Sequence, residues 1–462
     1  MHLYFTRATG AEATVGDLEQ AQARTFLREE SVVGMPFLLD AHGVYLADLN
    51  RWLRSLPTSG APARLTWRAY ARDVKDWGSF LEAHGVGFWE ADEGDLAVYH
   101  RVRRMGPDRI SRGTWDRICF ALDRVYSWAV EEGVIRAKPF DARRIREKGG
   151  PSRNIRFVSK RDYAFFRDVG LRGLLPDGSQ DPLSRVENVE RNTAFADLLV
   201  TTGLRLTEGS YALVSEPPQA TTDQEILKQR WRVPEGLAKG GKERYTLVPV
   251  RVLRALDDYV RFERSVQVRR ARDQGRYAGS EWTVLTRLTE HAGRDATTGA
   301  VVKTRHAGPS DRTGLLYSAD GVLAPAMLFL GDEGLPLSHE AWESIFRRAN
   351  DRCARFGLDL HITPHVLRHT FATWTLAQYL REHMRGNASG GGTYAAYLLA
   401  PVRRLMRLLG HSSAVTTFAY LDLVGDAPEV LDEVLGETLF DEMPELGDDD
   451  NQDRLTLHTA NR

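Results

Sequence analysis

Bulky apolar side chains recur at helical spacing in two segments of the first third of the chain. The two stripes are Trp67, Tyr70, Val74, Trp77 and Leu81, then Trp115, Ile118, Leu122, Val125 and Trp128. Spacings of three and four residues place each stripe on one face of a helix, and that face has to be buried against another element. Ser111 or Thr114 can cap the second helix. The pattern predicts two amphipathic helices in the core of a helical bundle.

Gly149-Gly150-Pro151 interrupts this helical region, and basic and polar residues continue to about Arg156. Such a stretch is typical of an interdomain linker. A length of 462 residues allows about two to three domains. We therefore predict five segments, listed in chain order: an N-terminal extension (1–34), a helical domain (35–148), a linker (149–156), a second domain (157–425) and a C-terminal tail (426–462).

The second domain combines helical patterns with one hairpin signature. Short β-like runs at 231–233 and 245–248 flank a Gly-rich turn at 238–242, which predicts an antiparallel hairpin. Residues 265–320 are polar and rich in Arg, Gly and Thr, so we expect an insertion with long loops there, and a second insertion near 382–401 that includes a Gly-rich loop. Helices are expected at 192–202, with Thr207 able to cap the next one, and at 338–355, 364–381, 401–409 and 414–424. The predicted fold class is mainly α with a small β-sheet or hairpin.

Charge is segregated along the chain, although 62 basic and 63 acidic residues nearly cancel. Residues 412–462 hold thirteen acidic and two basic residues, so residues 1–411 carry a net charge of +10. Between Asp95 and Arg161 there are seventeen basic and eight acidic residues. This excess is either a footprint for phosphate or a solvated helical face. The candidate DNA contacts in it are Arg101, Arg103, Arg104, Arg143, Arg144 and Arg146.

Several protein classes are excluded by composition. No apolar run approaches the roughly 20 residues that span a bilayer, and residues 1–30 lack a signal-peptide pattern. The two cysteines, Cys119 and Cys353, are too few for a disulfide framework or a cysteine-based zinc cluster. We expect a cytosolic, reducing setting.

One group of residues has the chemistry to act on a phosphodiester. Two guanidiniums can bind the non-bridging oxygens, imidazoles can donate hydrogen bonds or move protons, a lysine can protonate a leaving alkoxide, and a tyrosine hydroxyl can attack phosphorus. Each residue alone has an ordinary structural explanation, and only the set in this order favours catalysis. The set is Arg205, Lys239, His365, Arg368, His411 and Tyr420.

His365 and Arg368 are three residues apart, so they share one helical face just after Pro364, which suits a first helical turn. His365 and His369 could also be metal ligands at i and i+4. The segment lacks the glutamate of a His-Glu-x-x-His motif and no cysteine cluster assists, so we predict no metal site.

Four segments resemble the tyrosine recombinases, also called phage integrases. They are Thr202-Gly-Leu-Arg-Leu-Thr-Glu208, Lys239-Gly-Gly-Lys-Glu-Arg244, Thr363-Pro-His-Val-Leu-Arg-His-Thr-Phe-Ala-Thr373 and Leu408-Leu-Gly-His-Ser-Ser-Ala-Val-Thr-Thr-Phe-Ala-Tyr-Leu421. The resemblance covers about residues 60–425. It implies a two-domain DNA clamp, with a core-binding domain before a catalytic domain.

By resemblance, Tyr420 is the nucleophile, Arg205 and Arg368 bind the phosphate, and His365 and His411 assist as hydrogen-bond donors or in proton transfer. Lys239 is the general acid, chosen over Lys242, which is kept as a DNA contact. Glu208 and His369 are supporting residues. The family needs neither metal nor nucleotide, so no cofactor is expected.

The resemblance also implies a partner and an assembly. The partner is double-stranded DNA with a specific recombination site, bound by a homo-tetramer on synapsed DNA that is a monomer or dimer when free, with accessory proteins. The setting is the cytoplasm of a bacterium, at the nucleoid, with a bacterial or phage gene. The rivals are a type IB topoisomerase and a non-enzymatic DNA-binding relative. The apolar positions of the tail suit either packing on a neighbouring subunit or capping of the same domain.

Overall fold

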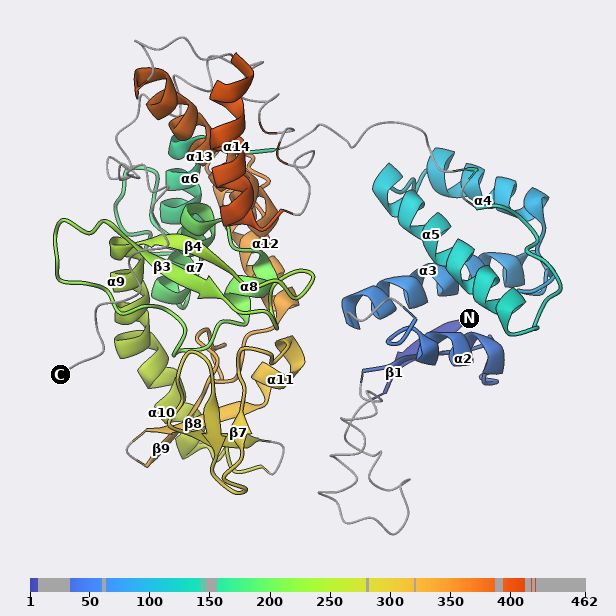
Figure 1. The fold of residues 1–462 in the computed structure, drawn as a ribbon, viewed down its shortest axis with the longest axis horizontal. Coiled ribbons are helices and arrows are strands. Elements are labelled where there is room, and N and C mark those ends of the chain that lie inside the picture. Colours follow the sequence, from blue (N-terminus) through green and yellow to red (C-terminus); the bar gives the residue numbers. More distant parts are fainter. Residues whose placement is uncertain are drawn as a thin grey trace. The chain divides into compact units, whose positions relative to one another are not determined.

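The computed structural model describes residues 1–6, 34–59, 64–142, 144–145, 156–279, 282–319, 321–386, 394–411, 417 and 420. The chain divides into two compact units, Met1–Pro151 and Ser152–Arg462. Both are mainly helical with small sheets (Figure 1), which confirms the predicted fold class. In the described part of the chain, no helix is long and apolar enough to cross a membrane.

The described part of the first unit contains β1 (His2–Phe5), β2 (Pro36–Leu39), α2 (Ala47–Ser55), α3 (Arg64–Ala83), α4 (Glu93–Met105) and α5 (Arg112–Glu131). Helices α2 and α3 contact the two-stranded sheet of β1 and β2, and α4 and α5 pack against α3. The predicted stripes on α3 and α5 are in the core, where Trp77 and Trp115 are fully buried. Trp77 Nε1 donates to the Tyr126 hydroxyl at 3.0 Å, which satisfies the buried indole N–H. Of the two candidate caps, Ser111 accepts from the Thr114 N–H.

Strand β1 lies in the segment expected to be an unpatterned extension. It pairs antiparallel with β2 in the register His2 with Leu39. Four residues are too few to produce a recognisable alternation, and the pairing partner is more than thirty residues away. The rest of the predicted extension, residues 7–33, lies outside the described residues.

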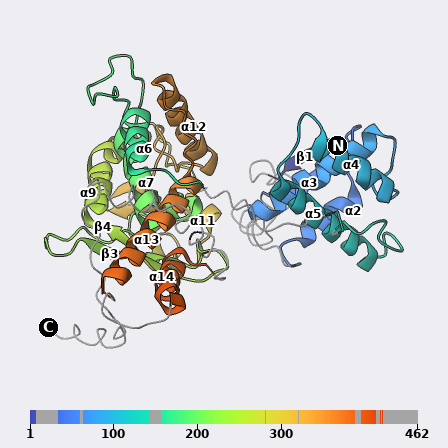
Figure 2. The same ribbon diagram turned by 90° about the horizontal axis from the view of Figure 1, so that it is seen from above.

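The second unit is built around α7 (Val189–Thr202), which contacts α9 (Val250–Tyr259) and α13 (Pro364–Gly386). The core includes the stacked rings of Phe195 and Trp342. Helices α13 and α14 (Tyr394–Leu409) lie side by side (Figures 1 and 2), and they extend into the range 382–401 that was expected to be an insertion. The other helical elements are α6 (Lys160–Phe165), η2 (Phe166–Leu171), α8 (Leu206–Ser210), η3 (Val260–Arg264), α10 (Ser265–Asp273), α11 (Pro309–Thr313) and α12 (His339–Arg355).

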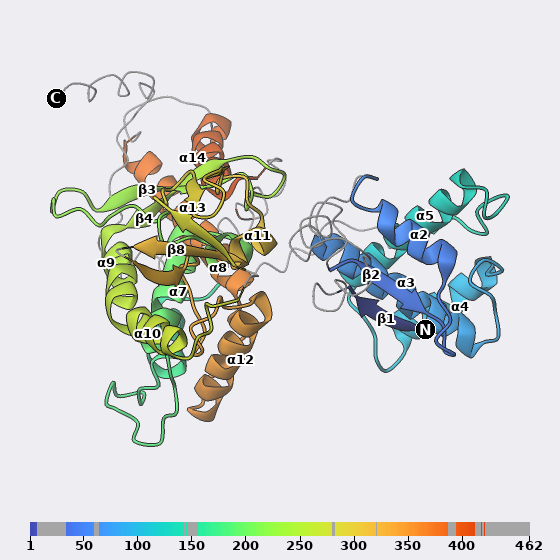
Figure 3. The same ribbon diagram turned by 90° about the horizontal axis from the view of Figure 1, so that it is seen from below.

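The predicted hairpin is confirmed as β3 (Lys228–Val233) paired antiparallel with β4 (Arg244–Pro249). The prediction of long loops at 265–320 was wrong. Figure 3 shows α9 and α10 as one long helical run, and the chain then forms a five-stranded sheet of order β7-β6-β5-β8-β9 with its own buried core. The strands are β5 (Thr283–Thr286), β6 (Gly293–Asp295), β7 (Val301–Val302), β8 (Leu315–Ala319) and β9 (Val322–Pro325). We call this sheet and its connections the insertion sheet.

Candidate active site

The first half of the site is a carboxylate that holds two arginines. Arg205 is the N-cap of α8, and the expected cap, Thr207, lies inside the helix. The Arg205 backbone N–H donates to Glu208 Oε2 at 2.7 Å. Arg205 Nη1 donates to Glu208 Oε1 at 2.8 Å. Arg244, at the start of β4, donates to both oxygens of Glu208 at 2.7 and 2.6 Å. Burial alone would raise the pKa of the Glu208 carboxyl, but Arg244 and Arg205 outweigh it and hold that pKa below its usual value.

Arg368 adds a third guanidinium, on the first turns of α13. Its side chain is buried and donates to the backbone carbonyls of Gly203 and Leu409, the latter at 2.7 Å. Burial and then Arg205 lower the pKa of Arg368, which follows from placing two cations close together away from water. Among the described residues, three arginines and one carboxylate give this half of the site a net charge of +2, which favours the binding of an anion.

Gly410 brings the end of α14 against this cluster. Its φ is +63°, and a Cβ there would lie 2.7 Å from Arg244 Cδ. Arg244 Nε also donates to the Leu408 carbonyl at 3.0 Å. A side chain at position 410 would therefore displace the arginine that joins β4 to Glu208.

The second half of the site is a chain of neutral groups that ends on Tyr420. The Tyr420 hydroxyl lies 2.6 Å from His369 Nδ1, and His369 Nε2 lies 2.9 Å from His365 Nε2. Burial lowers the pKa of His369 to about 4, with His365 and Arg368 contributing, and burial also lowers the pKa of His365. Burial raises the pKa of Tyr420 to about 12. At neutral pH the tyrosine is therefore protonated, and the neutral ring of His369 can accept a hydrogen bond from it.

His411 links the two halves. Its Nε2 lies 3.3 Å from Arg368 Nη2, and its Nδ1 lies 3.0 Å from the Thr417 hydroxyl. Because an arginine can only donate, Nε2 is the acceptor and the proton sits on Nδ1. Burial, Arg368 and Arg205 lower the pKa of His411 to about 4.

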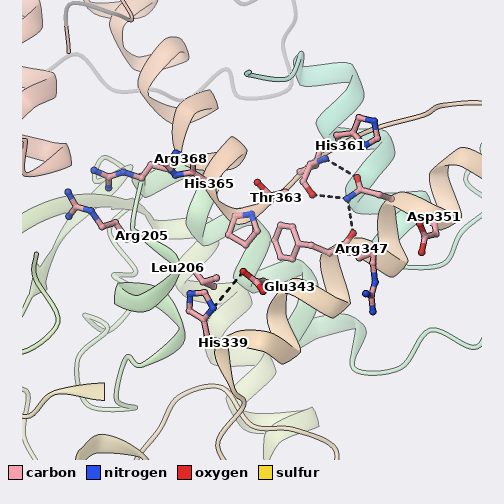
Figure 4. A pocket seen from close by; sticks show the side chains of 14 residues that line it. Arg205, Leu206, His339, Glu343, Arg347, Asp351, His361, Thr363, His365 and Arg368 are labelled. Carbon is pink, nitrogen blue, oxygen red and sulfur yellow. Dashed lines mark hydrogen bonds and ion pairs between the residues drawn. The ribbon is translucent and has the colours of Figure 1, made fainter. Parts of the chain in front are cut away.

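A cavity of about 660 Å³ opens beside the site between α8, α12 and the start of α13. Figure 4 shows Arg205 and Arg368 at one end of the cavity and His361 and Asp351 at the other. His365 also lines it. An anion that enters this cavity therefore meets both guanidiniums.

The two lysines are placed differently from the other site residues. Lys239 and Lys242 are exposed in the turn between β3 and β4. Within the described residues, neither has a hydrogen bond or ion pair with the rest of the site. The structure thus brings together Arg205, Glu208, His365, Arg368, His369, His411 and Tyr420, and it leaves both lysines at the surface.

The candidate DNA contacts of the first unit are in varied environments. Arg101 is exposed on α4, whereas Arg103 pairs with Asp76 at 3.0 Å and Arg104 donates to the Ile110 carbonyl. Arg144 is exposed and lies 3.5 Å from Asp141. Arg143 and Arg146 lie outside the described residues, as do the predicted acidic tail and most of the helix expected at 414–424.

Sequence reasoning missed Arg244 and Thr417 as site residues. Arg244 ends the Lys239–Arg244 segment and directly precedes the β-like run 245–248. This position at the base of the predicted hairpin was the one sequence feature that could have identified it. Its partner Glu208 is 36 residues away, which no local pattern reveals. In the part of the chain that the structure describes, no group of three or more His, Cys, Asp or Glu side chains is placed to hold a metal ion.

Known proteins match both units. Residues 49–133 match the N-terminal SAM-like domain of phage integrases, and residues 183–380 match the phage integrase family. The tyrosine recombinase XerD of Mycobacterium tuberculosis is 25% identical over 379 residues, which cover 80% of this chain and 91% of that protein. XerD of Corynebacterium glutamicum is 36% identical over 100 residues, 22% of this chain and 25% of that protein. A solved XerH site-specific recombinase bound to palindromic difH substrate has a TM-score of 0.47 and 14% identity, with 87% of this chain and 90% of that one covered.

Proposed function

Since the chain belongs to the phage integrase family of tyrosine recombinases, we propose that it is a site-specific DNA recombinase that cleaves and rejoins strands through a 3′-phosphotyrosyl intermediate. Its biological task would be integration, excision or transposition of a mobile element, or resolution of DNA multimers. The observation that carries the proposal is the Tyr420 hydroxyl bonded to a neutral histidine, next to a cluster of described residues with a net charge of +2.

In the proposed reaction, Arg205 and Arg368 bind the non-bridging oxygens of the scissile phosphate and stabilise the charge that grows in the transition state. The Tyr420 hydroxyl passes its proton to His369 Nδ1, and His369 passes its Nε2 proton to His365. The Tyr420 oxygen then bonds to phosphorus while the bond from phosphorus to the 5′-oxygen breaks.

The leaving 5′-oxygen needs a proton, and we assign its donor to Lys239. The position of this lysine in an exposed turn at the tip of β3 and β4 supports the assignment, because the same hairpin carries Arg244 into the site. A 5′-hydroxyl of another strand attacks the phosphotyrosyl bond in the reverse reaction, which regenerates Tyr420 and joins the new strand.

We further propose that the first unit contacts DNA through the arginines of α4, with the exposed Arg101 as the leading candidate. Arg143, Arg144, Arg146 and Lys242 complete the candidate DNA contacts. The active assembly would be a homo-tetramer on two synapsed sites.

The test uses fragmented genomic DNA from the source cell, because the target site is not required in advance. The full chain is incubated with the fragments and denatured, and DNA that stays covalently attached is sequenced. Wild type is expected to trap one recurring site, whereas Tyr420→Phe is expected to bind DNA and trap none. An adduct that persists in Tyr420→Phe would refute the assignment. Relaxation of supercoiled DNA without recombinant product would instead indicate a topoisomerase.

A further inference from the structure

The insertion sheet is attached to the hairpin that carries Lys239 and Arg244. The Gly236 N–H, just after β3, donates to the Arg305 carbonyl at 2.9 Å, and Glu235 pairs with His306. On β3 itself, Arg232 is buried and donates to the Glu290 carbonyl. Two loops of the insertion sheet, 287–291 and 303–306, therefore bond to the base of the turn. We call these two loops the hairpin-flanking face.

The contact at Gly236 leaves no room for a side chain. A Cβ at this position would lie 2.4 Å from the Ala307 carbonyl oxygen and 2.7 Å from the His306 carbonyl oxygen. The backbone of the insertion thus lies directly on the backbone of the turn, and the two segments are held in one arrangement.

The insertion sheet is also rigidly joined to the rest of the unit. Arg312 and Glu216 are both buried and form an ion pair, with Nη1 to Oε1 at 2.8 Å. Arg312 also donates to the Thr304 carbonyl at 2.9 Å, directly beside the flanking face. A buried pair with these additional hydrogen bonds fixes the loops in position.

The hairpin-flanking face exposes three cationic side chains that form no ion pair within the described residues. Arg287, Lys303 and Arg305 are exposed. Within the described residues, the side chains of Arg287 and Lys303 have no hydrogen bond or ion pair, and Arg305 Nε donates to His306 Nε2 at 2.9 Å. Two carboxylates lie beside them: Glu235 contacts His306, and Glu290 contacts His291. The three cations therefore outnumber the two carboxylates. Arg287 has a φ of +52°, which is uncommon for a residue with a side chain.

We propose that the hairpin-flanking face binds the phosphate backbone of duplex DNA next to the scissile phosphate, on the side from which Lys239 approaches. The inference rests on the proposed function, because it uses the hairpin to place the DNA. Isolated cations on a rigid surface suit phosphates, which need no base recognition. The insertion would therefore lengthen the DNA segment that the catalytic unit covers.

The test measures how the affinity for a labelled 40-base-pair duplex of arbitrary sequence depends on salt, in the Tyr420→Phe background so that no cleavage interferes. The variant carries Arg287→Gln, Lys303→Gln and Arg305→Gln. The matched control carries Arg269→Gln, Arg270→Gln and Arg272→Gln, which remove three exposed cations of α10. Figures 1 and 3 show α10 apart from α11, the helix that follows loop 303–306 of the flanking face. Each phosphate contact contributes about 0.9 to the slope of log affinity against log salt concentration.

We expect the slope to fall by about 2 to 3 in the flanking-face variant and by less than about 1 in the control. Equal losses in both variants would show that only net charge matters and would overturn the proposal, as would an unchanged slope in both. An outcome in which wild type forms no adduct with DNA, while the slope still falls in the flanking-face variant alone, would refute the recombinase function and leave the DNA contact in place.

Discussion

The two halves of the site hold their charges in opposite ways. In the arginine half, the buried carboxylate of Glu208 keeps Arg205 and Arg244 in position and stays ionised because both guanidiniums contact it. In the histidine half, burial keeps His369 and His411 neutral and Tyr420 protonated. A permanent positive charge is thus placed where an anion has to bind, and neutral groups are placed where a proton has to move. Arg368 belongs to both halves, since it donates to the loop after α7 and contacts His411.

The largest effect is expected from Glu208→Gln, which would break the arginine half. Removing the carboxylate leaves Arg205 and Arg244 close together without their anion. Removing one partner of a buried ion pair costs about 3–5 kcal/mol of the free energy of unfolding. Chemical denaturation of the full chain measures it. The control is Asp257→Asn, which removes the partner of Arg261 in an exposed pair between α9 and η3 and should cost less than about 1 kcal/mol. Equal losses in the two variants would contradict this account of the arginine half.

Arg205→Ala tests whether the arginine half of the site contributes to the cleavage rate. The side chain of Arg205 is one-quarter exposed and lines the cavity, so its loss should affect the reaction more than the fold. Removing one preorganised stabiliser raises a barrier by about 2.7–4 kcal/mol. Single-turnover cleavage of the trapped DNA site measures this. Weaker DNA binding with an unchanged cleavage rate would show that Arg205 only holds the substrate.

Several parts of this organisation could be predicted from the sequence, because they depend on residues close together in the chain. The spacing of Trp67 and Trp77 predicts α3, and the three-residue separation of His365 and Arg368 predicts that they share one face of α13. The β3–β4 hairpin follows from two β-like runs around a Gly-rich turn.

The rest depends on contacts that no local pattern reveals. The strands of the insertion sheet contain two to five residues each, and β5 pairs in parallel with β8 about thirty residues later. Strands this short have no readable alternation. The link from Arg244 to Glu208 depends likewise on how the hairpin packs against α7. The sequence predicted the residue types that could act at a phosphate, and by resemblance it also predicted Glu208 as a supporting residue. It did not predict Arg244, the second arginine that Glu208 holds.

The buried histidines predict that the free energy of unfolding decreases at acidic pH. The pKa of His369 and of His411 falls from an ordinary value near 6.5 to about 4 in the folded state. As pH falls below 6.5 the unfolded chain takes up protons first, so the free energy of unfolding declines until about pH 4 and is unaffected by these groups above 6.5. The decline due to each histidine is on the order of 3 kcal/mol or less. Denaturation of His369→Asn should show a flatter profile than wild type, whereas His361→Asn, at an exposed histidine, should not. Parallel profiles for all three proteins would contradict the buried neutral state.

The smallest effect is expected from Thr417→Val, which tests how the two halves are joined. Thr417 is buried, and its hydroxyl accepts from His411 Nδ1, which leaves Nε2 free to accept from Arg368. Valine keeps the shape and removes the acceptor, so the coupling to His411 in a double-mutant cycle of cleavage rates should be about 0.5–1.5 kcal/mol. Thr373→Val is the matched control, because the Thr373 hydroxyl donates to the His369 carbonyl within α13 and contacts no ring nitrogen. Of these two threonines, Thr417 bonds to an imidazole and Thr373 does not. If both variants couple equally to His411, the tautomer of His411 is set by burial rather than by the hydrogen bond to Thr417.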